Sequence, residues 1–184
     1  MYFLSGTTHA QFDLRDASTG IGVVEGIGTK QLVPYPELQA GGSFGTSFLE
    51  WSAYWGSWND DLHALRYNDA IEYSYSGHIL GARLIFLPAS ALEQWPVPIA
   101  LFVGAAHQVI ARRDLGGEDL TGTRGSDGSE SANTLEAGLR AYARIGNAVE
   151  LRAEAHQFFR LGSDIVDMRQ TGRRAYTLGC AIFY

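Results

Sequence analysis

The chain has 184 residues, of which 46% are hydrophobic and 18% charged, a composition that can bury a core and excludes disorder of the whole chain. Its formal net charge of −6 argues against a nucleic-acid partner, because phosphate binding requires a basic surface. The 22 glycines and 12% aromatic residues favour turns and strands over helices. We therefore expect a single all-β domain over residues 1–184.

Cysteine and histidine usage excludes several kinds of site. Cys180 stands alone, so the chain has neither a disulfide framework nor a cysteine-based zinc site. None of the 5 histidines has ligand spacing, and we predict no metal and no cofactor. No apolar run reaches the roughly 18 residues of a transmembrane helix. Residues 1–11 lack the basic and apolar segments of a signal peptide, which leaves a cytoplasmic protein or a chain with its signal removed.

Alternation of apolar and polar residues dominates the first part of the chain and predicts strands. In chain order these lie at residues 3–14, 44–58, 69–76, 79–87 and 98–112. Residues 15–42 contain the sequence PYPE and many glycines, and are predicted to be a long loop. Gly77 and His78 are predicted to form a short link, and residues 59–68 an intermediate one.

The second part of the chain contains the clearest strand pair. Residues 113–132 are polar and acidic and predict a second long loop. Strands are then predicted at residues 135–145 and 149–155, joined at Gly146 and Asn147, two residue types that suit a tight turn. A further polar loop at 162–172 precedes a last strand at 173–184. The prediction is eight strands in total.

Eight antiparallel strands of this length close most economically into an up-and-down β-barrel, which removes the exposed sheet edges. A soluble barrel would turn its apolar face inward, whereas an outer-membrane barrel turns it toward lipid. The second arrangement is favoured because glutamates and arginines are nearly balanced on the polar face, and buried charges must be paired. The predicted lumen charge network, with a structural role, comprises Glu50, Glu72, Arg83, Glu136, Arg140, Arg144, Glu150, Arg152, Glu154, His156 and Arg160.

Aromatic residues near strand ends also favour a membrane barrel. Trp51, Trp55, Trp58, Tyr73, Tyr75, Phe159, Tyr176 and Tyr184 are predicted to form interfacial girdles. The chain ends YTLGCAIFY, with Tyr176, Leu178 and Ile182 at alternate apolar positions before the terminal Tyr184. This ending resembles the C-terminal assembly signal of bacterial outer-membrane barrels. The whole pattern resembles the small eight-stranded barrels of the outer-membrane protein A and opacity protein type.

The resemblance implies a bacterial outer-membrane location with the signal peptide removed, termini in the periplasm, short periplasmic turns and longer outside loops. It implies contacts with outer-membrane lipid and lipopolysaccharide, and recognition of the C-terminal strand by the barrel-assembly machinery. The expected function is structural or interactive, with loops 15–42 and 113–132 contacting a protein or glycan partner.

Two alternatives remain open from the sequence. One is an outer-membrane enzyme that modifies lipid A or phospholipid and depends on His107 or His156. However, HQV at 107–109 and HQF at 156–158 lack the His-x-Ser pattern of lipid A deacylase barrels, so absence of enzymatic activity is the favoured expectation. The other is a soluble β-barrel that binds a small hydrophobic ligand between its leucine and alanine faces. For the lumen charges, a structural network is favoured over an ion path, because isolated buried charges are costly.

Overall fold

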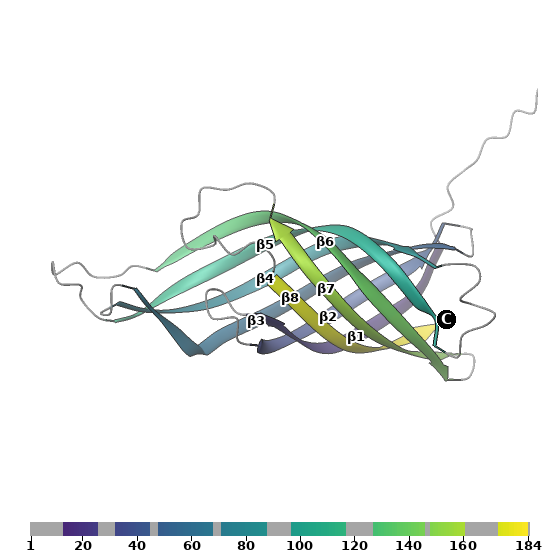
Figure 1. Ribbon diagram of the computed structural model, residues 1–184, viewed down its shortest axis with the longest axis horizontal. Coiled ribbons are helices and arrows are strands. Elements are labelled where there is room, and N and C mark those ends of the chain that lie inside the picture. The colour runs from purple at the N-terminus through teal and green to yellow at the C-terminus, as the bar shows by residue number, and fades with distance from the viewer. Residues whose placement is uncertain are drawn as a thin grey trace, which may run out of the picture.

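The computed structural model describes residues 13–25, 32–44, 48–67, 71–87, 97–116, 127–145, 148–160 and 173–183. Within these ranges the chain forms eight strands (Figure 1). They are β1 (Asp13–Glu25), β2 (Leu32–Ser43), β3 (Leu49–Tyr67), β4 (Ile71–Phe86), β5 (Ile99–Gly116), β6 (Gly128–Ile145), β7 (Val149–Arg160) and β8 (Arg173–Phe183).

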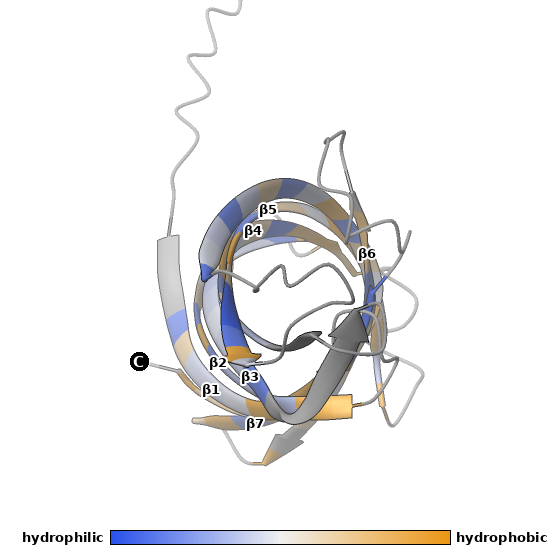
Figure 2. Cartoon of the chain, turned by 90° about the vertical axis from the view of Figure 1, so that its left-hand side faces the viewer, coloured by the Kyte–Doolittle hydropathy of each residue, from blue (hydrophilic) through white to orange (hydrophobic). Residues whose placement is uncertain are grey.

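Every strand pairs antiparallel with the next one in the chain, and the sheet closes on itself. Closure is made by β1 and β8, whose register runs from Asp16 opposite Phe183 to Val24 opposite Ala175. Figure 2 looks along the barrel and shows the strands as a ring. The predicted all-β, eight-stranded antiparallel up-and-down barrel is confirmed. Among the residues described, no helix is long and apolar enough to cross a membrane.

The barrel is inverted relative to a soluble protein. Large apolar side chains point outward, with exposed fractions of 63% for Leu80, 59% for Leu101 and 71% for Leu178. Arg83 and Arg140, in contrast, are each only 1% exposed. Since an exterior of this kind is stable only against lipid, the predicted lipid-facing arrangement is confirmed and the soluble ligand-binding barrel is not supported.

The prediction of a long loop at 15–42 is wrong, because this segment supplies most of β1 and all but one residue of β2. Pro34 and Pro36 suggested a loop, but they lie beyond the point where the β2–β3 ladder ends, at Glu37 opposite Gly56. At Gly22, an added Cβ would collide with the Tyr176 carbonyl oxygen, so this glycine permits close approach of β1 and β8. Of the predicted first strand at 3–14, residues 3–12 lie outside the described part of the chain.

The predicted break at Gly77 and His78 is also wrong, because both lie inside the continuous strand β4. Gly77 is required for packing and not for a turn: a Cβ there would lie 2.8 Å from Nε1 of Trp58 on β3. The predicted link at 59–68 is likewise wrong for residues 59–67, since β3 continues to Tyr67. The packing of Gly77 against Trp58 is repeated at Gly81, where a Cβ would lie 2.5 Å from the ring of Tyr54. Glycine opposite an aromatic ring is therefore how this narrow barrel fits large side chains inside.

The girdle prediction requires outward side chains, which only part of its residues have. Trp55 and Tyr176 are exposed on the outer face, whereas Trp58 and Tyr75 are buried inside the barrel. The error at Trp58 and Tyr75 follows from strand register, because each occupies an inward position of its strand. Tyr184 lies outside the described residues, and the side chain of Tyr73 is likewise not described.

Four strands extend well beyond the others at one end. A tilted transmembrane strand needs about 9–11 residues, yet β3, β4, β5 and β6 have 19, 16, 18 and 18. Their ends project away from the C-terminus (Figure 1). We call residues 57–67, 71–78, 107–116 and 128–133 the protruding sheet. The loop predicted at 113–132 is therefore too long, since β5 reaches Gly116 and β6 begins at Gly128.

Candidate functional site: the charged lumen

Arg83 on β4 is the centre of the barrel interior. Its guanidinium donates to both carboxylate oxygens of Glu37, at 3.0 and 3.1 Å, and to Glu154 Oε2 at 2.8 Å. Its Nε donates to Glu136 Oε1 at 3.2 Å. The ring of Tyr54 covers one face of the guanidinium, with the carbon Cζ 3.7 Å from the ring centroid. One arginine from β4 thus ties together carboxylates from β2, β6 and β7.

Arg140 on β6 extends this cluster. Its Nη2 lies 2.6 Å from Glu154 Oε1 and donates to Gln39 Oε1 at 2.8 Å. The amide nitrogen of Gln39 donates in turn to Glu154 Oε1 at 3.1 Å and to Glu37. The hydroxyl of Tyr35 donates to Glu37 Oε2 at 2.9 Å. The central cluster therefore holds two arginines, three glutamates and two neutral groups that bond to them, an arrangement that pairs most of the buried charge.

A second cluster lies toward the end of the barrel that carries the C-terminus. Arg152 on β7 binds Asp16 of β1 through two nitrogens, at 3.2 and 2.6 Å, and its Nε donates to Glu150 Oε1 at 2.9 Å. The Tyr142 hydroxyl donates to Glu50 Oε2 at 3.4 Å. Because Asp16 and Arg152 come from β1 and β7 on either side of β8, their fork-shaped ion pair spans the interior side of the C-terminal strand.

A third group lies toward the protruding end. Arg173 of β8 donates to the carbonyl oxygen of Glu25 at 2.7 Å and to Gln108 at 3.4 Å, and its guanidinium stacks 4.3 Å from the Trp58 ring centroid. Gln108 donates to the Thr134 hydroxyl at 3.3 Å. The lumen thus holds polar side chains at three levels along its length. All the side chains of this third group are buried, which is typical of an interior filled by its own side chains.

The structure places the predicted lumen residues as follows. Arg83, Glu136, Arg140, Glu150, Arg152, Glu154 and His156 are buried inside, and Glu50 is partly buried there against Tyr142. The side chains of Glu72, Arg144 and Arg160 are not described, although their backbones pair within β4, β6 and β7. The predicted set is therefore brought together in part, in two clusters.

Sequence reasoning missed Arg173 and Gln108 of the third group. It also missed two carboxylates inside the segment 15–42. Glu37 makes the two-oxygen contact to Arg83, and Asp16 makes that to Arg152. A signal was present in residues 32–39, where Val33, Tyr35, Glu37 and Gln39 alternate with Leu32, Pro34, Pro36 and Leu38. The two prolines concealed this period-two pattern.

The two histidines weighed as catalytic candidates have different surroundings. His156 is buried between Phe102 and Phe158, and its Nδ1 lies 3.5 Å from Nη2 of Arg83. His107 is exposed on the outer face, where its Nδ1 lies 2.9 Å from Asn133 Oδ1. Across the described ranges, no three His, Cys, Asp or Glu side chains are grouped so that they could hold a metal ion.

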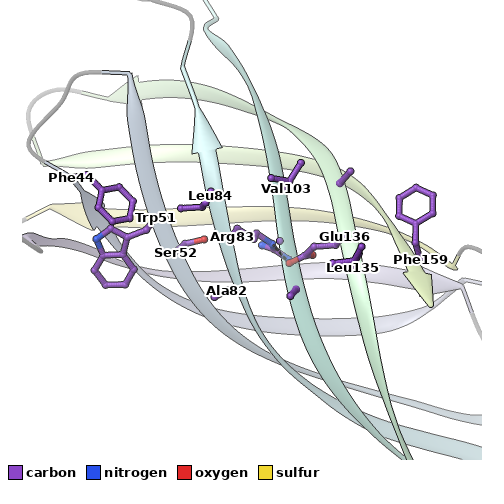
Figure 3. Close-up of a pocket in the computed structure, with 13 residues that line it drawn as sticks. Phe44, Trp51, Ser52, Ala82, Arg83, Leu84, Val103, Leu135, Glu136 and Phe159 are labelled. Atoms are coloured by element: carbon purple, nitrogen blue, oxygen red, sulfur yellow. Dashed lines mark hydrogen bonds and ion pairs between the residues drawn. The ribbon is translucent and has the colours of Figure 1, made fainter. Parts of the chain in front are cut away.

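The outer face carries a shallow apolar depression of about 680 Å³ across β3 to β7 (Figure 3). Large side chains surround small ones: Trp51, Leu84, Val103, Leu135 and Phe159 stand around Ala82, Ala105 and Ala137. Gly104 also lines it, and a Cβ at this position would lie 2.7 Å from Oε1 of Glu136. The wall is therefore thin above the Arg83–Glu136 ion pair, and lipid chains lying against this face would come close to the central cluster.

The residues of the predicted C-terminal assembly signal lie on the lipid-facing side of β8. Tyr176, Leu178 and Ile182 are exposed by 43%, 71% and 57%. Tyr184 lies outside the described residues. The outward direction of these side chains follows from strict alternation with the buried Ala175, Thr177 and Ala181.

Comparison with solved structures identifies the fold. The chain superimposes on Neisserial surface protein A with a TM-score of 0.64, at 14% identity, covering 92% of this chain and 96% of that one. It matches a major outer membrane protein from Thermus thermophilus with a TM-score of 0.65, at 13% identity, over 94% and 100%. A third match is Ail of Yersinia pestis in complex with the heparin analogue sucrose octasulfate (TM-score 0.53, 13% identity, 93% and 97%).

No protein-family model and no curated protein matches the chain. The closed barrel, its apolar exterior and its charged interior nevertheless define a class. By fold, this protein is a small eight-stranded β-barrel of the outer-membrane type. The resemblance expected from the sequence is thereby confirmed at the level of architecture.

Proposed function

We propose that the protein is a bacterial outer-membrane barrel that presents the protruding sheet, and the connections at its tip, to a partner outside the cell. The observation that carries this proposal is the unequal strand length. β3 to β6 are several residues longer than a membrane crossing requires, whereas β2, β7 and β8 have only 12, 12 and 11 residues. The C-terminus lies at the other end, on the periplasmic side in this orientation.

The filled lumen supports an anchoring role over transport. Its central charges are nearly inaccessible and are joined by ion pairs between strands, so the interior is rigid. Such a barrel holds the protruding sheet in a fixed orientation, and binding residues are typically presented by rigid scaffolds of this kind.

The chemistry of the partner follows from the surface of the protruding sheet. Its described outward side chains include Arg113, Ser129 and Ser131, and the exposed Glu130, Asp127 and the half-buried Asp114 lie near the adjoining strand ends. Both charge signs are present together with hydroxyls, which suits a protein or a neutral or mixed-charge glycan. Ail was crystallised with a heparin analogue. The mixed charges here favour a less anionic ligand.

We also propose contacts within the membrane. The apolar outer face would contact outer-membrane lipid and lipopolysaccharide. The barrel-assembly machinery would recognise the alternating apolar residues of β8 during insertion.

The test is binding by intact cells that express the protein. Residues 117–126, which connect β5 to β6 at the protruding end, are replaced by a Gly/Ser linker of equal length. The matched control replaces residues 88–96, which connect β4 to β5 at the opposite end. We expect only the exchange of 117–126 to abolish adhesion of the cells to cultured epithelial cells. We also expect cells with either variant to bind weakly to immobilised heparin. Equal adhesion of both variants and the parent, with the protein in the outer membrane, would refute the interaction role.

A further inference from the structure

The protruding sheet is paired with the rest of the barrel only at its base. Its ladder to β2 ends at Glu37 opposite Gly56, and the described ladder to β7 ends at Thr134 opposite Arg160. Every residue of the protruding sheet lies beyond these two points. Within the described ranges, backbone pairing therefore does not hold the protruding sheet against the shorter wall that β7, β8, β1 and β2 form.

The boundary between β2 and β3 shows why the backbone is insufficient there. β2 stays paired with β1 as far as Leu32 opposite Glu25, and β3 stays paired with β4. Pro34 and Pro36 have no N–H to donate, so β2 cannot complete a ladder to β3 at these positions. A groove of about 420 Å³ lies between the two strands instead. The tilt of the protruding sheet must therefore be fixed by side chains.

Arg173 of β8 reaches from the shorter wall to the protruding sheet. Its Nε donates to the carbonyl oxygen of Glu25 on β1 at 2.7 Å. On the protruding sheet, its Nη1 donates to Gln108 Oε1 at 3.4 Å, and its guanidinium carbon lies 4.3 Å from the ring centroid of Trp58. The side chains of Arg173, Gln108 and Trp58 are buried in the lumen, so water screens these contacts little.

Both partners of Arg173 on the protruding sheet are themselves held by its other strands. The indole of Trp58 lies on the lumen side of Gly77 on β4, where a Cβ would be 2.8 Å from Nε1. Gln108 donates to the Thr134 hydroxyl of β6, which in turn donates to the carbonyl oxygen of Ala106 on β5. The contacts of Arg173 with β3 and β5 therefore extend to all four strands of the protruding sheet.

An apolar cluster also crosses this part of the lumen and includes Val33 and Tyr35 of β2 together with Trp58 and Ile110. Apolar packing resists separation of the two walls, but it is non-directional and allows them to slide. A guanidinium has a flat face for an aromatic ring and N–H donors in its plane, so its contacts fix an orientation. Because a buried cation is costly to desolvate, a positioning role explains Arg173 better than a purely stabilising one.

We propose that Arg173 is a clasp that fixes the tilt of the protruding sheet over the lumen, and that it thereby positions this sheet for its partner. The second part of this inference rests on the proposed interaction role, and the first part does not. Arg173 is a positioning residue, because it acts through Trp58 and Gln108 and is itself buried.

The test is a distance measurement across the mouth of the barrel, by pulsed electron resonance on the full chain refolded into lipid nanodiscs. Spin labels are attached to Leu32→Cys on β2 and Ser131→Cys on β6, two exposed positions on opposite sides of the mouth, with Cys180→Ala in the background. A second pair, Leu38→Cys with Leu139→Cys, reports the part of the wall where the ladders are complete.

Arg173→Met removes the donors of the clasp and keeps a similar volume. It should widen the distance distribution at the mouth by several ångströms and leave that of the second pair unchanged. The matched control is Arg174→Met, at the exposed neighbouring position of β8, which should change neither distribution. If Arg173→Met does not fold, Arg173→Lys replaces it and should also widen the mouth, because an ammonium lacks the planar fork of donors.

A rescue variant tests why the clasp is needed. Pro34→Val with Pro36→Val in the Arg173→Met chain returns two N–H donors to β2. The ladder to β3 should then extend, and the distance distribution at the mouth should narrow again. Adhesion of cells that express each variant is measured in parallel. We expect Arg173→Met to weaken adhesion at an unchanged amount of protein in the outer membrane, and Arg174→Met to leave it unchanged.

Three results would overturn the clasp. They are an unchanged distribution at the mouth in Arg173→Met, equal widening in Arg174→Met or at the second pair of labels, and a distribution that stays wide after the proline exchange. Normal adhesion by an Arg173→Met barrel with a widened mouth would overturn the positioning role. Absence of adhesion by the parent would refute the interaction role, and the positioning role with it, whereas the distances still decide whether the clasp exists.

Discussion

Replacing Arg83 by methionine would remove the one cation, among the described side chains, that contacts Glu37, Glu136 and Glu154 together. The arginine donates four charge-assisted hydrogen bonds and is fully buried, and methionine would occupy a similar volume. Each such bond contributes a net 1.5–3 kcal/mol or so, and the contributions are not additive. Removing one member of a buried ion pair costs about 3–5 kcal/mol.

For Arg83→Met we expect the free energy of unfolding to fall by about 5 kcal/mol, the upper end of this range, because several carboxylates lose their partner at once. Arg140 contacts Glu154, but the described contacts give it no bond to Glu37 or Glu136. The assay is urea unfolding of protein refolded into lipid vesicles, followed by tryptophan fluorescence and by the heat-dependent gel shift. The matched control is Arg113→Met, on the exposed outer face of β5, which should change stability by less than about 0.5 kcal/mol.

A second variant tests the reason for the loss. If unpaired carboxylates cause it, Arg83→Met combined with Glu37→Gln should be more stable than Arg83→Met alone. An Arg83→Met barrel within about 1 kcal/mol of the parent would refute the view that this network holds the lumen together. A double variant less stable than the single one would refute the assignment of the cost to Glu37.

Other expectations follow from packing and from the lipid face. Gly81→Ala places a methyl group 2.5 Å from the Tyr54 ring and should cost about 1–3 kcal/mol in the same urea titration, whereas Ala82→Gly next to it should cost less. Leu178→Arg puts a charge at the middle of β8 on the lipid face and should cost about 2–4 kcal/mol. Leu115→Arg, near the end of the protruding sheet, should be almost neutral, and equal losses at the two leucines would contradict the proposed membrane position.

The number of strands was predicted correctly although individual strands were not. The first strand was placed too early in the chain, β2 was missed, and β4 was counted twice. These errors share a cause. Glycine and proline were interpreted as local turn residues, whereas contacts with adjacent strands explain them here. Gly77 and Gly81 make room for aromatic rings of β3. Pro34 and Pro36 lie where β2 has no ladder to β3. A single sequence does not show which neighbouring strand a residue will face.

The β6–β7 hairpin shows the opposite case. Its register, with Ile145 opposite Val149, follows from a short local connection and strict alternation, so the sequence was sufficient. The inversion of the barrel could also be predicted from the sequence. One face of the strands carries leucine and alanine and the other carries glutamate and arginine, and only one arrangement of these faces is stable in lipid.

The sequence by itself thus determined the class of barrel, the lipid-facing residues and most of the charges inside. Only the tertiary structure decided which charges meet. Arg83 binds Glu37 on β2 and Glu154 on β7, strands brought close by closure of the sheet and not by any local pattern. The end of the β2–β3 ladder at Glu37, next to Pro36, is likewise decided by pairing between strands. The physical reason is that alternation is a property of a single strand, whereas pairing across the lumen depends on the register and tilt of all eight.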